Sequence, residues 1–221
     1  IRTRLVGSEM CIRDSSLDGP SPEIYSCLGN VNFYLEDYST SISFYQKSIK
    51  IDQMFKESYF GLGRSLSKLD KWFEAIHFFK KAYKIDNKNI EYVKSLAYAE
   101  FKVGNLVSSI DLYSKAVEMQ PDDYKLSLDF SLIYYESGDI DKAIDIIDQA
   151  IEESPGESLL YYRLVIYLMD AGRYKESINV LESALSLNFD NHDVLFDFVP
   201  NFESQSALIR VINQFKNSGH R

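Results

Sequence analysis

The sequence has little of what builds turns, disulfide frameworks or nucleic-acid surfaces. Its 221 residues include 10 glycines and 5 prolines, which favours helices over a fold of many short strands. Acidic residues outnumber basic ones by 33 to 24, and the net charge of −9 argues against general nucleic-acid binding. No apolar run approaches the roughly 18 residues that a membrane span needs. With 45% hydrophobic and 26% charged residues, the composition is that of a globular protein.

Residues that carry catalysis or bind metals are also scarce. Two cysteines cannot form a disulfide framework, and none of the three histidines (His77, His192 and His220) pairs with another at metal-binding spacing. No histidine lies near Cys27 in the sequence, so nothing there indicates a nucleophile with its base. The acidic stretch 139–153 lacks the Asp-x-Asp-x-Asp-Gly loop of a calcium site. We therefore expect no enzyme, no metal and no cofactor.

The first fifteen residues do not share the pattern of the rest. Residues 5–15 resemble a translated sequencing adapter, because Glu9 to Asp14 back-translate as GAG ATG TGT ATA AGA GAC. We therefore interpret residues 1–15 as a non-native segment, followed by a lead-in over residues 16–21. On this interpretation the native start, and any repeats upstream of it, are missing from the sequence.

The remaining chain repeats with a period of 34 residues. Five series of positions at this step each keep one size class, and the clearest series is isoleucine throughout. Its members are Ile42, Ile76, Ile110, Ile144 and Ile178. The period predicts five units, over residues 22–55, 56–89, 90–123, 124–157 and 158–191.

Each unit carries two apolar patterns of helical spacing, separated by a turn. Tyr59, Leu62 and Leu66 recur at i, i+3 and i+7, which is one face of a helix, and a second such face follows from Trp72 onward. Gly104 and its equivalents mark the turn between the two. We expect two antiparallel helices per unit, whose backbones approach closely where the sequence has glycine or alanine.

These features resemble the tetratricopeptide repeat. The resemblance rests on Leu62-Gly63 in the first helix, on an aromatic residue between alanines in the second, and on Pro121 and Pro155 at the junctions. It covers residues 22–191 and implies an all-α, right-handed α-solenoid of five helix-turn-helix repeats. It further implies a scaffold that binds a protein or peptide partner.

The pattern weakens at single positions and then stops. Glu100 stands where a large apolar residue is usual in the family. Residues 192–216 then predict a degenerate capping unit, with a short helix over 192–199 and an amphipathic helix over 205–216. Such a unit covers the last apolar face of a solenoid. The tail is residues 217–221.

A second stripe on the first helices lies about 120° from the core stripe, at 100° per residue. In stacked hairpins of this family that direction faces the concave groove. Ten of its fifteen positions are aromatic or aliphatic, which predicts a partner-binding groove. The alternative is that these side chains pack against neighbouring first helices. The predicted groove residues are Phe33, Phe60, Arg64, Lys68, Lys94, Tyr98, Phe101, Lys102, Leu128, Leu132, Tyr135, Tyr162, Ile166 and Met169.

Charge is unevenly distributed along the chain. Residues 16–110 carry 12 basic and 11 acidic groups, whereas residues 111–221 carry 9 and 20. The predicted groove is basic in the second and third units and apolar in the fourth and fifth, which fits a ligand with an acidic end and an apolar end. Some family members clamp a terminal carboxylate with Lys and Asn side chains. Here the corresponding places hold Phe60, Arg64 and Tyr98 beside Lys94, which does not support that clamp.

The leading functional hypothesis is a non-catalytic protein–protein interaction scaffold that binds a peptide or a partner helix in the groove. One alternative is a regulatory or substrate-docking arm of a larger enzyme or signalling protein that is truncated at its N-terminus. Another is a self-associating structural module, and hence a homo-oligomer. We expect a cytoplasmic protein with no nucleic-acid partner and no membrane span, and the missing native start leaves a signal peptide open.

Overall fold

The computed structural model describes residues 21–199, 202 and 205–217. The expected adapter segment 1–15, most of the lead-in and residues 218–221 of the tail lie outside this part. The chain divides after Ala116 into two compact units, which we call unit 1 and unit 2 and describe separately.

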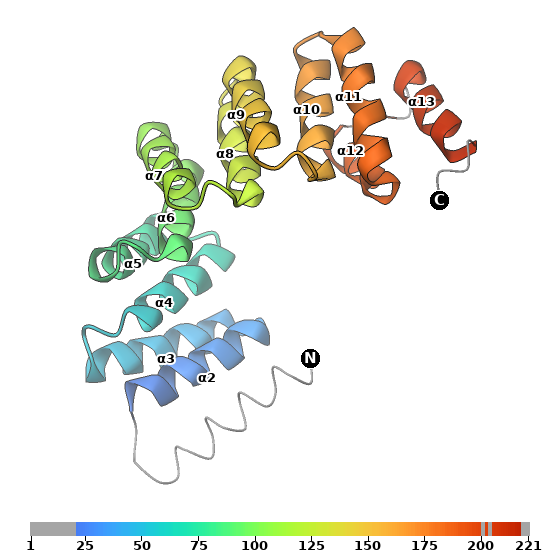
Figure 1. The fold of residues 1–221 in the computed structure, drawn as a ribbon. Helices are drawn as coiled ribbons and strands as arrows, with labels where there is room; N and C mark the ends of the chain where they lie inside the picture. The colour runs from blue at the N-terminus through green and yellow to red at the C-terminus, as the bar shows by residue number, and fades with distance from the viewer. Residues whose placement is uncertain (1–20, 200–201, 203–204, 218–221) are drawn as a thin grey trace. The chain divides into compact units, whose positions relative to one another are not determined.

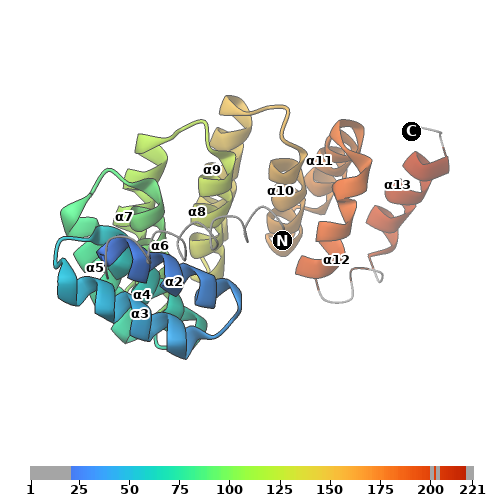
Figure 2. The ribbon, with the colours of Figure 1, turned by 90° about the horizontal axis from the view of Figure 1, so that it is seen from below.

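Unit 1 consists of consecutive helices that pack as antiparallel neighbours. Figures 1 and 2 both show α2 beside α3, and α4 packs against α5 in the same way. The second helix of each hairpin also packs against the first helix of the next hairpin, α3 on α4 and α5 on α6. Leu112 of α7 packs on the same core cluster as Leu96 of α6. The helices are α2 (Pro22–Tyr34), α3 (Tyr38–Ile51), α4 (Lys56–Lys68), α5 (Trp72–Ile85), α6 (Ile90–Lys102) and α7 (Leu106–Met119), and the division after Ala116 falls within the last turn of α7.

Local sequence explains where these helices begin. Ser21 caps α2 by accepting a hydrogen bond from the Ile24 amide at 3.3 Å, and proline occupies the first helical position. Asp37 caps α3 by accepting from the Thr40 amide at 3.0 Å. Asn89 does the same for α6. These side chains satisfy amide groups that the helix itself leaves unpaired.

Small residues let the two helices of a hairpin approach closely, as the sequence predicts. A Cβ atom at Gly63 would lie 2.6 Å from the Phe79 ring, so any larger residue between α4 and α5 there would require the ring to shift. Ala75 and Ala82 are fully buried on the facing side of α5. The aromatic rings of one helix therefore fill the space that the small residues of its neighbour leave.

Unit 2 repeats the hairpin arrangement and ends in shorter helices. α8 packs against α9, α9 against α10, and α10 against α11. The expected helix over 192–199 is instead a 3-10 turn, η1, followed by the short helix α12; the expected amphipathic helix is present as α13, which packs on α11. The elements are α8 (Tyr124–Glu136), α9 (Ile140–Glu153), α10 (Ser158–Asp170), α11 (Tyr174–Leu187), η1 (Phe189–Asp193), α12 (Val194–Phe198) and α13 (Ser206–Asn217).

The described residues are all-helical apart from the turns, and they form consecutive hairpins with C-terminal helices on the last one. The fold class predicted from the sequence is thereby confirmed. Within this part of the chain, no helix is long and apolar enough to cross a bilayer.

Candidate interaction surface

A guanidinium held between aromatic rings marks the first-helix face of unit 1, which we define as the surface formed by the groove stripe of α2, α4 and α6. The Arg64 carbon Cζ lies 4.2 Å from the centroid of the Phe33 ring on α2 and 5.8 Å from that of Phe60 on its own helix. Among the described residues, Arg64 makes no ion pair with a carboxylate. Its charge is therefore held in place by cation–π contacts and is available to a ligand.

A second aromatic and basic group lies one hairpin further along. Trp72 and Tyr98 meet edge to face with centroids 5.6 Å apart, and the Lys102 ammonium lies 5.8 Å from the first ring and 6.0 Å from the second. Tyr98, Lys102 and Lys68 are exposed, and neither lysine has an ion-pair partner within the described part of the chain. Lys94, by contrast, lies 3.6 Å from Glu91 on the same helix.

Several predicted groove residues of unit 1 serve in packing rather than on an open surface. Phe33 is buried beneath Arg64. Phe60 lies between Phe79 and Tyr92, with ring centroids at 5.8 and 4.7 Å. Phe101 is partly buried. Here the alternative of contact between neighbouring first helices describes Phe33 and Phe60, while Lys68, Lys102 and Tyr98 remain exposed.

In unit 2 the groove-stripe residues of the last repeat are buried in the core. Tyr162, Ile166 and Met169 are 0%, 1% and 4% exposed, so these three residues cannot line an open groove, contrary to the expectation. The physical reason is that η1 and α12 pack on α10 and cover this face. The Tyr162 hydroxyl donates to the Asn188 carbonyl at 2.8 Å, and burial raises its pKa.

The fourth repeat contributes half-buried residues. Leu128 and Leu132 pack as partly exposed side chains of α8. The Tyr135 ring stacks on Tyr167 of α10 at a centroid distance of 4.7 Å, and its hydroxyl donates to the Asp170 carboxylate. Burial, together with the hydrogen bond to Asp170, raises the pKa of Tyr135 to about 12. This tyrosine therefore joins two first helices to each other and remains protonated at neutral pH.

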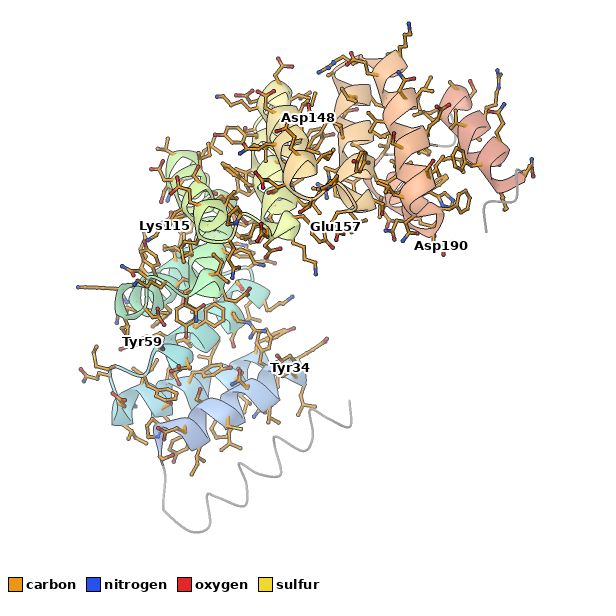
Figure 3. The ribbon with its side chains drawn as sticks, in the orientation of Figure 1. Tyr34, Tyr59, Lys115, Asp148, Glu157 and Asp190 are labelled. Atoms are coloured by element: carbon orange, nitrogen blue, oxygen red, sulfur yellow. The ribbon has the colours of Figure 1, made fainter. Side chains whose placement is uncertain are left out.

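Charge reverses between the units at one repeat position, the end of each first helix. Unit 1 has Tyr34, Lys68 and Lys102 there, and unit 2 has Glu136 and Asp170. Figure 3 labels Tyr34 at the end of α2, where 53% of its surface is exposed. The reversal can be read from the 34-residue period, and the predicted groove includes only the two lysines of this position.

Two charged side chains make contacts that the groove stripe alone does not predict. In unit 2, Arg163 stacks on Phe198 of α12 at 3.9 Å, a contact that depends on the position of the C-terminal segment. In unit 1, the buried carboxylate of Glu100 lies 2.7 Å from the Lys80 ammonium and accepts a hydrogen bond from Asn105 at 2.6 Å. The departure at Glu100 thus has a structural explanation, because the carboxylate ties α6 to α5 and to the following turn.

The histidines and acidic side chains of the described ranges do not form a metal site. His77 is exposed on α5, and within the described ranges no group of three or more His, Cys, Asp or Glu side chains could hold a metal ion.

Family models described as tetratricopeptide repeat match residues 56–89, 100–165 and 159–191, which together exceed half of the sequence. The chain belongs to the tetratricopeptide repeat family. Proteins of this family are in general non-catalytic interaction modules, so its membership supports a role as a protein-interaction scaffold. No curated protein matches the sequence.

Solved structures with the same fold include YrrB, described as a tetratricopeptide repeat protein with an unusual peptide-binding site. YrrB is 18% identical with a TM-score of 0.64, and the match covers 82% of this chain and 93% of YrrB. A structure of MamA is 23% identical with a TM-score of 0.67, covering 81% of this chain and 98% of MamA. At such identities the likeness establishes the fold.

Proposed function

We propose that this tetratricopeptide repeat protein is a non-catalytic scaffold that binds an acidic peptide segment on the first-helix face of unit 1. The observation that carries the proposal is the set of three cations, Arg64, Lys68 and Lys102, which lack intramolecular carboxylate partners in the described chain. Arg64 supplies a planar, preoriented fork for a carboxylate, and the lysines supply more mobile charges.

Apolar contact on the same face comes from Tyr98 and Trp72. Tyr98 is 40% exposed and packs against Trp72, so a partner side chain can cover the ring without moving the backbone. Aromatic anchors of this kind supply a large share of the affinity at protein interfaces. An acidic segment that also carries an apolar side chain therefore fits this face best. The peptide-binding site in the description of YrrB supports the proposal as an example on the same fold.

The test is selection from a random peptide display library, followed by measurement of the best peptides in solution. We expect the intact chain to enrich peptides that combine Asp or Glu with an aromatic or aliphatic residue. Lys68→Glu with Lys102→Glu is expected to weaken these peptides about tenfold or more, because each substitution replaces an attraction by a repulsion. The control is Lys84→Glu with Lys88→Glu, which makes the same change in net charge at exposed positions on and after α5.

The control should bind as the unchanged chain does. Equal weakening by both pairs would show a general effect of net charge and contradict the proposed face. Enrichment of basic or uncharged peptides would contradict the proposed ligand chemistry.

A further inference from the structure

Unit 1 has a second unusual surface, which lies at the turns between the helices of each hairpin. Four large apolar residues are exposed there, and we call them the turn row. They are Leu35 at 71%, Leu69 at 38%, Phe73 at 79% and Val107 at 76%. Leu35 and Leu69 follow the last residues of α2 and α4, and Phe73 and Val107 are the second residues of α5 and α7.

The repeat brings these residues to one edge of unit 1. Leu35 and Leu69 are 34 residues apart, and so are Phe73 and Val107, so each pair occupies one position in successive hairpins. Single exposed apolar residues are ordinary on protein surfaces, whereas a row along one edge marks an interaction site. The equivalent places in unit 2 are Ser137, Ala171, Asp141 and Lys175.

The charges beside the turn row are of both signs. Glu36, Asp70 and Lys71 lie in the turns next to it, all three exposed and none in an ion pair in the described structure. Glu36 and Asp70 have positive φ angles of 63° and 56°, where the later turns have Gly104, Gly138 and Gly172. Non-glycine residues pay a conformational cost there, so two carboxylates are kept at the edge against that cost.

We propose that the turn row is the interface of a symmetric dimer with a second copy of this chain. A two-fold contact presents the same patch from both sides, so it needs apolar residues together with charges of both signs that can pair across the axis. The turn row with Lys71, Glu36 and Asp70 meets that requirement, and it offers no single-sign field to a strongly acidic or basic partner.

The net charges of the two halves of the chain also favour a second copy of this chain as the partner at the turn row. Residues 16–110 have 12 basic and 11 acidic groups, so two copies of this part meet without net repulsion. Residues 111–221, with 9 basic and 20 acidic groups, would repel their counterparts. Contact between copies is therefore favoured at unit 1. Its turn row adjoins the first-helix face proposed for peptides, because Lys68 directly precedes Leu69 and Trp72 directly precedes Phe73.

The experiment is sedimentation equilibrium of the full chain over a concentration series. We expect a monomer–dimer equilibrium that Phe73→Ser with Val107→Ser weakens by about a hundredfold or more, because each substitution occurs twice in a symmetric dimer. The matched control is Tyr174→Ser with Leu187→Ser, which removes two exposed apolar residues of unit 2, at 57% and 43%. The control should dimerise as the unchanged chain does, and circular dichroism should show equal helicity for all three.

A second variant tests the charges. Lys71→Glu should weaken the dimer, since an attraction across the axis becomes a repulsion. Added salt, which weakens the dimer of the unchanged chain, should strengthen that of the variant, because it screens the repulsion. A chain that is monomeric throughout the series overturns the proposal, and capture of a different protein by the turn row would then identify its occupant. Dimerisation that survives the Phe73 and Val107 substitutions overturns it as well. If Lys68→Glu with Lys102→Glu abolishes dimerisation while Phe73→Ser with Val107→Ser leaves it unchanged, the interface lies on the first-helix face instead.

Discussion

At the same repeat positions, the two units differ in the burial and in the charge of their side chains. At the position of Tyr98 unit 1 has an exposed aromatic residue, and unit 2 has Ile166 in the core. At the end of the first helices the charge changes from lysine in unit 1 to glutamate and aspartate in unit 2. The difference shows that the 34-residue period determines where a side chain lies on its helix, while neighbouring elements determine whether that place is open or covered.

The largest expected effect comes from truncating the side chain at the position of Tyr98 and Ile166 in each unit. Ile166→Ala should cost about 2–5 kcal/mol of unfolding free energy, since it empties space in a core that η1 and α12 close. Tyr98→Ala should cost about 1 kcal/mol, mainly the contact with Trp72. Chemical denaturation followed by circular dichroism measures both. Equal costs would mean that the two positions do not differ in burial and would contradict the distinction between the units.

A second comparison concerns volume at the closest approach between the helices of a hairpin. Gly63 in unit 1 and Val165 in unit 2 are equivalent by the period, and Val165 is fully buried. Gly63→Ala should cost about 1–3 kcal/mol, because the added methyl meets Phe79. Val165→Ala should cost about 2 kcal/mol for the opposite reason, an unfilled space.

The two causes separate in a double substitution. Phe79→Leu should restore part of the stability lost in Gly63→Ala, since it removes ring atoms from the site of the clash. Strictly additive losses in that pair would show that the Phe79 ring does not limit the approach of the helices.

The turns provide a third comparison of smaller size. Asp70 in unit 1 and Gly138 in unit 2 both have positive φ, at 56° and 88°. Asp70→Gly should stabilise the chain by several tenths of a kcal/mol, because relief at positive φ exceeds the entropy that glycine adds to the unfolded chain. Gly138→Ala should destabilise by about 1 kcal/mol. Thermal and urea unfolding measure both, and a loss of stability in Asp70→Gly would show that the aspartate has a stabilising role in the turn.

The hairpins could be predicted from the sequence because period, helical spacing and small residues all indicate the same element. Gly63 and Phe79 are the clearest case, because a glycine at this repeat position predicts that the two helices of the hairpin approach closely. The open or buried state of the groove stripe could not be predicted in this way. Tyr162 and Tyr98 are both aromatic residues on the same stripe, and only the packing of the C-terminal elements on α10 distinguishes them. The cation contacts of Arg64 and Arg163 likewise depend on which ring a neighbouring helix supplies.

The smallest comparison concerns the pKa values of carboxyl groups. Asp148, labelled on α9 in Figure 3, lies near Asp145 and Glu152 of the same helix. Partial burial raises the pKa of Asp148 above its ordinary 3.8, Arg173 opposes the shift, and the neighbouring carboxylates add to it. In unit 1 the hydrogen bond from Lys56 at 2.6 Å lowers the pKa of Asp86.

The two shifts predict opposite effects of the same substitution. A carboxyl with a raised pKa favours folding while it is protonated and opposes folding once pH rises through its folded pKa, so Asp148→Asn should stabilise the chain at pH 7. The gain should be a few tenths of a kcal/mol, the size of like-charge pairs on a helix, and should vanish below the ordinary pKa of 3.8. Asp86→Asn should destabilise at pH 7, because the stability that its ionised form contributes is present above its unfolded pKa and lost as pH falls through the folded one. Urea unfolding at pH 7 and near pH 3 compares the two variants with the unchanged chain. Effects of the same sign at pH 7 would show that the neighbours of Asp148 do not disfavour its charge, and unit 2 would then bear its acidic surface without cost.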